Sequence, residues 1–141
     1  MDRSKRTRIL VEGSPELRRE LCRRVEASRR VEDIEEPGGA LVMLKLRESA
    51  RNGLFYIGEL LVTEAKVRVE GVVGIGVVSG DRPEAARELA VVDAACNAGL
   101  AETADWDPLL VEEAGRIERR EAVEASRVAL TRVAFESMDR A

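Results

Sequence analysis

The middle of the chain alternates apolar and polar residues with a period of two, which predicts strands. From Ala65 to Val69, apolar side chains take every second position and charged ones lie between them. This alternation is expected when one face of a strand packs inward and the other meets water. Glu70 and Gly71 then separate it from a second apolar run over residues 72–78. We therefore predict a tight antiparallel hairpin with these two residues at its turn.

The preceding residues predict a further hairpin and a longer strand. Residues 31–36 and 41–47 have the composition of strands, and the Pro-Gly-Gly sequence at 37–39 between them suggests a turn. Residues 49–53 break the pattern, and residues 54–63 resume it. Together with the central hairpin, these segments predict an antiparallel meander of four or five strands.

Helix signals lie on both sides of the meander. Residues 3–11 predict one helix, and Ser14 followed by Pro15 predicts the start of a second, because a capping residue and a first-turn proline favour helix initiation. After the meander, Asp81 is placed to cap a third helix, which we expect to run to about Ala98.

From residue 105 onward the pattern predicts one long helix or two. Residues 116–121 contain only one apolar side chain, so this stretch cannot bury much surface on its own chain and is expected to project. The order of elements predicts an α+β fold, an antiparallel meander of four or five strands flanked by N-terminal helices and a long C-terminal helical region. We expect residues 1–141 to form a single domain, with 105–141 as a projecting helical tail.

The end of the chain suggests a contact with another protein. Glu121 and Arg132 fall on a helical stripe that is otherwise apolar, so this seam is not purely intramolecular. Val133, Phe135 and Met138 could dock in a neighbour, or they could fold back onto the chain's own sheet. We predict a partner interface at Arg132, Val133, Phe135 and Met138, where docking of Phe135 or Met138 would contribute about 1.5–3 kcal/mol each.

Gly74 and Gly76 lie two residues apart and therefore on one face of the last predicted strand. They leave a flat patch where a helix, another chain or a ligand could approach closely. The run is not a dinucleotide-binding fingerprint, because the third glycine would be needed at Ser79 and Gly80 misses it by one. Since the following helix begins nearby, a stand-alone domain that binds a small anion on this patch is the alternative function.

Composition excludes several classes of function. The chain has no histidine, which removes serine and cysteine triads, histidine-containing zinc sites and imidazole proton shuttles. Aromatic residues make up 3% of the chain and the formal charge is −4, so nucleic-acid binding is not expected. Cys22 and Cys96 lack metal-ligand spacing and are expected to be reduced core residues. We therefore predict no catalytic residue and no metal site in this chain.

The remaining acids and the apolar segments give weaker indications. No run approaches about 18 apolar residues, so we expect a cytoplasmic protein without a membrane partner. Asp93 is a single acid on a predicted helix, and it could be a solvated or locally hydrogen-bonded carboxylate or a functional group. An independent enzyme that uses Glu59, Asp93 or Cys96 ranks last, because nothing in the sequence pairs these residues.

Two blocks of residues resemble the PhnG family of the bacterial phosphonate carbon–phosphorus lyase system. Residues 131–140, TRVAFESMDR, are similar to that family's C-terminal signature of Thr-Arg-Val, a spaced Phe, a spaced Met and an Arg. Glu136 stands where the family usually has a second aromatic residue, and Ala141 where it usually has glycine. The central block consists of Gly58, Glu59, Val62, Thr63, Ala65, Val67, Gly71, Gly74, Gly80 and Asp93.

The resemblance implies an accessory, structural subunit of the carbon–phosphorus lyase core complex, with PhnI as first partner and PhnH and PhnJ as others. Proteins of this kind are required, with PhnI, PhnH and PhnL, to transfer the ribose triphosphate moiety of ATP to an alkylphosphonate with release of adenine. Catalysis is attributed mainly to PhnI. The chain alone is then expected to bind no cofactor, ATP being a substrate of the assembled complex, and in isolation it could form a homodimer.

Two arginines in the C-terminal block have alternative roles under this resemblance. Arg132 and Arg140 could pair with partner carboxylates or cap a helix end, or they could reach an anionic substrate, because a guanidinium binds phosphate oxygens through two parallel hydrogen bonds. We therefore add Arg140 to Gly74 and Gly76 as a candidate for a ligand-binding or close-approach surface.

Overall fold

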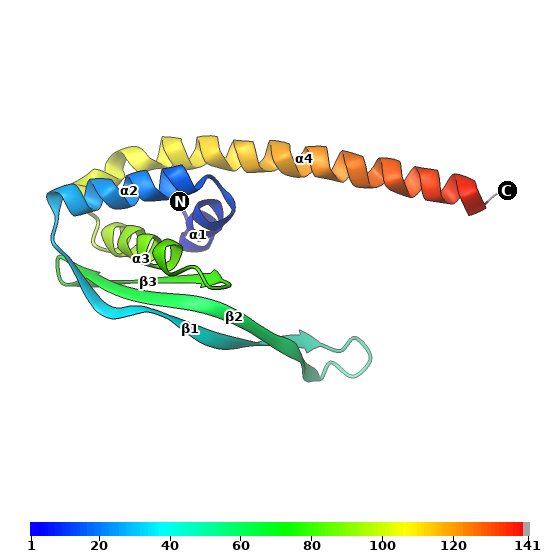
Figure 1. Cartoon of the computed structure of the whole chain (residues 1–141), viewed down its shortest axis with the longest axis horizontal. Helices are drawn as coiled ribbons and strands as arrows, with labels where there is room; N and C mark the ends of the chain where they lie inside the picture. The colour runs from blue at the N-terminus through cyan, green and yellow to red at the C-terminus, as the bar shows by residue number, and fades with distance from the viewer. Residues whose placement is uncertain (140–141) are drawn as a thin grey trace.

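The computed structural model shows an α+β fold in which helices cover one face of a single antiparallel sheet (Figure 1). It describes the backbone of residues 1–139 and the side chains of residues 1–131. The predicted α+β class, the N-terminal helices and the long C-terminal helix are confirmed. The elements in chain order are α1 (Arg3–Glu12), α2 (Pro15–Ser28), β1 (Val31–Arg47), β2 (Leu54–Val69), β3 (Val72–Ser79), α3 (Pro83–Asn97), the 3-10 helix η1 (Ala101–Asp105) and α4 (Trp106–Asp139).

The predicted strand count is wrong, because the sheet of the described chain has three strands in the order β1-β2-β3. Residues 37–39 do not form a turn and lie inside β1, where the pairing with β2 skips between Glu35 and Gly38. β1 is an edge strand, and an edge tolerates Pro37 and a local bulge because one side of its backbone needs no partner. β2 likewise continues without interruption through residue 64.

Two turns connect the strands, and both fall where the sequence placed breaks. The turn between β2 and β3 contains Glu70 and Gly71, with φ values of 50° and 79°. Positive φ at both positions suits a tight hairpin, and Gly71 adopts it without steric cost. The longer turn between β1 and β2 closes through Glu48, whose N–H donates to the Gly53 carbonyl at 2.8 Å.

Helix α3 lies across one face of the sheet and forms the centre of the core (Figure 1). Side chains of β2 that alternate along the strand, Ala65, Val67 and Val69, are fully buried on that face. The helix contributes a matching apolar surface, and this mutual burial is the main stabilising contribution to the fold. Its fully buried members are Ala86, Ala90, Val91, Val92, Ala94 and Ala95.

The connection from β3 to α3 is closed by Thr63 and not by the predicted cap. Helix α3 begins at Pro83 with Arg82 as the capping residue, and no side chain caps its N-terminus, so the assignment of Asp81 as the cap is wrong. Instead, the buried Thr63 hydroxyl donates to the Gly80 carbonyl at 2.6 Å and accepts from the Arg82 N–H at 2.9 Å. This pair of hydrogen bonds satisfies two main-chain groups where the chain leaves β3 and enters α3.

The first part of α4 packs on the rest of the molecule, which we call the body, and its later part extends past the other helices (Figure 1). Trp106, Leu110 and Ile117 are buried at spacings of four and seven residues, as expected for one helical face. Among the described residues, the last hydrogen bonds from α4 to α1 are made by Arg120, which donates to the Glu12 carbonyl at 2.8 Å, and Glu121, which accepts from Arg8 at 2.9 Å. Residues 122–131 are all exposed.

Candidate functional site: an exposed apolar arm

The hairpin of β1 and β2 extends well beyond the helices that cover the rest of the sheet (Figure 1). We call the extended part, residues 41–47 of β1 and 54–61 of β2, the arm. Within it Leu41 pairs with Leu61, and the register continues to Arg47 opposite Leu54, with one bulge between Leu44 and Lys45. Strand β3 ends at Ser79, opposite Val62, so the arm has two strands where the rest of the sheet has three.

The arm is apolar and exposed at the same time. Every one of its residues is in the exposed class, although most belong to types that are normally buried. A typical monomer exposes a largest apolar patch of about 300–600 Å², and larger patches mark interaction sites. The large hydrophobic side chains of the arm, each 39–63% exposed, are Leu41, Val42, Met43, Leu44, Leu46, Leu54, Phe55, Tyr56, Ile57, Leu60 and Leu61.

Both faces of the arm carry apolar side chains. Successive residues of a strand point to opposite faces, so Leu61 shares the face of Ala65, which packs on α3. Leu41 is paired with Leu61 on this inner face, whereas Val42 and its partner Leu60 lie on the outer face. A hairpin that merely borders solvent would carry polar side chains on one face. The arm therefore has the composition of a hairpin that is covered on at least one side.

We call the rest of the sheet, residues 31–40 of β1, 62–69 of β2 and all of β3, the base. Its inner face is closed tightly by α3 at the two glycines singled out by the sequence. A Cβ atom added at Gly76 would lie 2.0 Å from the Ala86 carbonyl oxygen, and one added at Gly74 would lie 2.1 Å from that of Ala90. These separations are far below van der Waals contact, so only glycine allows the helix to approach this closely. The surface of Gly74 and Gly76 is thus occupied by α3.

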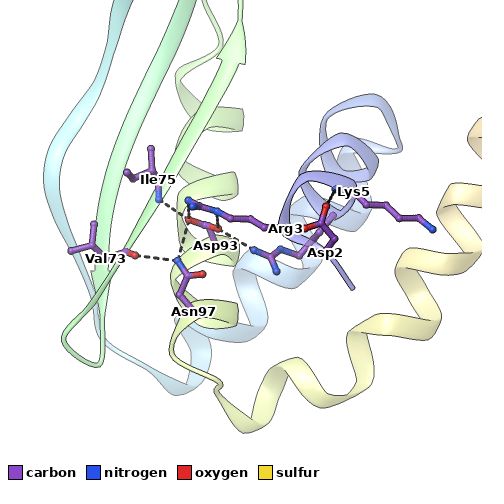
Figure 2. A network of polar contacts seen from close by, with 8 residues as sticks. Asp2, Arg3, Lys5, Val73, Ile75, Asp93 and Asn97 are labelled. Atoms are coloured by element: carbon purple, nitrogen blue, oxygen red, sulfur yellow. Dashed lines mark hydrogen bonds and ion pairs between the residues drawn. The ribbon is translucent and has the colours of Figure 1, made fainter.

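Asp93 is buried where α1, α3 and β3 meet (Figure 2). Its carboxylate accepts hydrogen bonds from Arg3 Nε at 2.9 Å and Nη2 at 2.7 Å, from Arg6 Nη2 at 3.0 Å and from the Ile75 N–H at 3.0 Å. Asn97 donates to the same carboxylate and to a β3 carbonyl, both at 3.3 Å. The Asp93 carboxylate is therefore neither solvated nor only locally bonded, because most of its hydrogen-bond partners are distant in sequence. It ties α1 and the free edge of β3 to α3.

Of the three residues considered for independent catalysis, Asp93 and Cys96 lie one turn apart on α3, and Glu59 lies far from both. Asp93 bonds to Ile75, which pairs with Lys66, whereas Glu59 lies on the arm seven positions further along β2, or about 23 Å at the rise of a strand. The Cys96 thiol is half-buried, and burial raises its pKa, which disfavours the reactive thiolate. Burial likewise raises the pKa of the Cys22 thiol to about 12.

The side chains of the predicted C-terminal interface lie outside the described residues. Residues Arg132, Val133, Phe135 and Met138 belong to α4 by backbone, but their side chains lie outside the described residues. Arg140 lies outside the described residues altogether. Both the docking and the fold-back alternatives for this tail therefore stay predictions.

The described part of the chain contains neither a metal-binding cluster nor a membrane-spanning helix. Among these residues, no group of three or more histidine, cysteine, aspartate or glutamate side chains is placed to hold a metal ion. None of the described helices is both long and apolar enough to cross a membrane.

Sequence reasoning missed the arm, although a signal for it was present. It treated residues 41–47 and 54–61 as ordinary strands of a meander, yet these strands contain consecutive apolar residues and not an alternation. LVML at 41–44 and LFYI at 54–57 are the clearest cases. A continuous apolar run in a strand is typical of a strand buried on both faces. The sequence does not show what would bury these strands.

Comparison with known proteins places the chain in a family. A family model described as phosphonate metabolism protein PhnG matches residues 1–141, the full length of the sequence. No curated protein matches the chain. The match covers the whole chain, including the arm and α4, and indicates a role in phosphonate metabolism. The chain belongs to the PhnG family of phosphonate metabolism proteins.

Proposed function

We propose that this chain is an accessory subunit of a protein complex that metabolises phosphonates, and that it binds its partner through the arm. The observation that carries this proposal is the exposure of eleven large apolar side chains on a two-stranded hairpin. An isolated two-stranded hairpin is at best marginally stable in water, and exposed apolar patches of this kind favour association. A partner surface would bury them and hold the arm in place.

The assignment of catalysis to a partner is supported by the state of the chain's own reactive groups. The buried carboxylate of Asp93 accepts hydrogen bonds from two arginines, and the buried carboxylate of Glu113 accepts from the Ser14 N–H at 2.6 Å and from Arg116 at 3.1 Å. These hydrogen bonds engage both carboxylates within the fold. Displacement of adenine needs a proton donor near the leaving base, and these acids are committed elsewhere.

The resemblance to PhnG proteins gives the proposal its finer content. The partner of the arm is PhnI, and the assembly includes PhnH and PhnJ and works with PhnL in the bacterial cytoplasm. The assembled complex transfers the ribose triphosphate moiety of ATP to an alkylphosphonate and releases adenine. In this scheme the present chain shapes and stabilises the catalytic partner, and ATP binds to the complex and not to this chain alone.

Co-purification with PhnI tests the proposal. The informative variant replaces residues 43–59 by Asn-Gly, which joins the directly opposed Val42 and Leu60 through a two-residue hairpin turn. We expect the wild-type chain to co-purify with tagged PhnI in equal stoichiometry and the shortened chain to be lost from the complex. The shortened chain should fold alone, because the residues removed are exposed.

Two controls make the result specific. Thermal unfolding of the isolated shortened chain shows whether the body is intact, and Val111→Ser removes an exposed apolar side chain on α4 without touching the arm. Wild-type protein that fails to bind PhnI would refute the proposal. Retention of the shortened chain in the complex would show that another surface makes the contact.

A further inference from the structure

We propose that the partner encloses the arm on both faces, in an apolar cleft whose far end is acidic. This inference rests on the proposed function and specifies the geometry and chemistry of the binding surface. It differs from simple docking, in which one face of the hairpin would lie on the partner and the other would remain in water.

The first argument is the symmetry of the two faces. On the inner face, Leu41 and Leu61 are 63% and 50% exposed, and on the outer face Val42 and Leu60 are 42% and 39% exposed. Each pair is directly opposed across the two strands. A hairpin selected to lie on a surface would keep one polar face, because polar side chains avoid the cost of exposed apolar area. Neither face of this arm is polar at these positions.

The second argument is size. The arm consists of seven residues of β1 and eight of β2, the segments 41–47 and 54–61. Specific interfaces generally use about 20–30 residues a side. One face would offer only half of the arm, which is far too little for a specific contact. Covering both faces brings the arm close to the required size and leaves the remainder to neighbouring surfaces.

The third argument is charge at the tip. Residues 45–52 include Lys45, Arg47 and Arg51 but only one acid, Glu48, in a chain whose formal charge is −4. Lys45 lies over the Tyr56 ring at 5.1 Å from its centroid, and Arg47 donates to the Asn52 carbonyl at 3.1 Å. Lys45 and Arg47 thus contact an aromatic ring of the arm and a carbonyl of its turn, and not a carboxylate, so their charge is available to a partner. Complementarity calls for acidic side chains where the tip ends.

Outside the arm, the inner face of the sheet and the free edge of β3 are already occupied, whereas Val73, Ile75 and Val77 on the outer face of β3 are 38–43% exposed. On the inner face, α3 covers β2 from Thr63 onward but does not reach the arm. At the free edge of β3, Asp93 and Asn97 occupy a main-chain N–H and a carbonyl that could otherwise pair with another strand. Such devices are found at the base and not along the arm.

The experiment compares matched double variants by titration of purified PhnI at low salt. Leu41→Ser with Leu61→Ser alters the inner face, and Val42→Ser with Leu60→Ser alters the outer face at the neighbouring pair. We expect each to weaken binding about a hundredfold, because each buried apolar side chain contributes about a factor of ten. The control Val111→Ser should bind within about twofold of wild type, as expected for a side chain outside the contact.

Arg51→Glu tests the acidic end of the cleft. We expect it to weaken binding about tenfold at low salt and less at high salt, because mobile ions screen charges near a surface. Circular dichroism and thermal unfolding of each isolated variant show that the fold is intact. Sedimentation of the isolated chain with and without the face variants shows whether a second copy uses the same surface.

The outcomes separate the inference from the function on which it rests. If PhnI binds wild type and only one face variant weakens binding, the arm is docked and not enclosed, and the inference is overturned while the proposed function stands. If Arg51→Glu binds as tightly as wild type, the acidic end is wrong. If wild type does not bind PhnI, both the proposed function and the inference fall. A second copy that competes with PhnI for the arm would also overturn the choice of occupant.

Discussion

The base of the sheet and the arm are built from the same two strands, yet one is core and the other is surface. In β2, Val67 and Val69 are fully buried, whereas Phe55 and Ile57 are about half exposed. The difference lies in what covers them, because α3 crosses the base and no described element of the chain covers the arm (Figure 1). An apolar strand therefore indicates that its side chains are buried, but it does not indicate whether its own chain or a partner buries them.

The largest expected effect on the base comes from Asp93, whose carboxylate links α1 and β3 to α3. We expect Asp93→Ala to lower the free energy of unfolding by about 3 kcal/mol, because it leaves Arg6, whose side chain is only 11% exposed, without its carboxylate. It also frees the Ile75 N–H. Urea unfolding followed by circular dichroism measures the change. The control Asn97→Ala, on the same helix but exposed, should cost about 1 kcal/mol or less.

A loss below about 1 kcal/mol for Asp93→Ala would contradict this account of the base. It would mean that α1 and the edge of β3 are held by apolar packing alone. The arm should not respond to this change, and binding of PhnI by the folded fraction of the variant should stay near that of wild type.

Two glycine-to-alanine variants, one in the base and one in the arm, compare the two regions directly. We expect Gly76→Ala to destabilise the fold by about 2–3 kcal/mol, because the added methyl group would overlap the α3 backbone. Gly58→Ala on the arm should change stability by less than about 0.5 kcal/mol, since a Cβ there meets nothing within 4 Å. Thermal and urea unfolding of both variants provide the measurement. Similar losses at the two positions would show that the arm is covered within the chain.

The local parts of this fold were predictable and the long-range parts were not. The start of α2 at Pro15 and the turn at Glu70 and Gly71 follow from residues next to each other. Residues 37–39 resembled a turn, because only the continued pairing with β2 distinguishes a turn from the bulge at residues 36–37. A Pro-Gly-Gly sequence suits an edge bulge as well as a reverse turn.

The candidate site likewise combines features that local sequence predicts with long-range contacts that it does not. Arg3 and Arg6 reach Asp93 across 90 and 87 positions of sequence, a separation that no local pattern encodes. The consecutive apolar residues of the arm indicated a buried strand, and the structure was needed to show that the chain itself does not bury it. The family resemblance pointed to the C-terminal block, whose side chains from Arg132 onward lie outside the described residues, whereas the exposed apolar surface of the arm emerged only from the structure.

Acid should lower the free energy of unfolding through Glu102, which lies outside the arm. Hydrogen bonds from Arg29 at 3.0 Å and Ser28 at 2.6 Å lower the pKa of Glu102 from 4.5 to about 2. Because the pKa is lower in the folded state, this contact stabilises the fold fully above pH 4.5, and the stabilisation is lost as the pH falls toward 2. The effect should be small, since the contact is near the surface.

Unfolding of wild type and Glu102→Gln between pH 6 and pH 2 measures this contribution. We expect the difference in stability between the two proteins to narrow through the window from about 4.5 down to 2. The chain with residues 43–59 replaced by Asn-Gly should keep the same window, because Glu102 lies in η1, close to the end of α2. A difference that stays constant with pH would assign the effect to packing and not to charge.

The smallest expected effect is the most informative about the arm. Leu41→Ser with Leu61→Ser should change the free energy of unfolding of the isolated chain by less than about 0.5 kcal/mol, although leucine-to-serine changes in a core would cost several times more. The reason is that both side chains remain at least half exposed in the folded chain, so little burial is lost. Urea unfolding at two protein concentrations separates intrinsic stability from self-association. A loss above about 1 kcal/mol that grows with concentration would show that a second copy covers the arm, and one independent of concentration would show that the chain covers it itself.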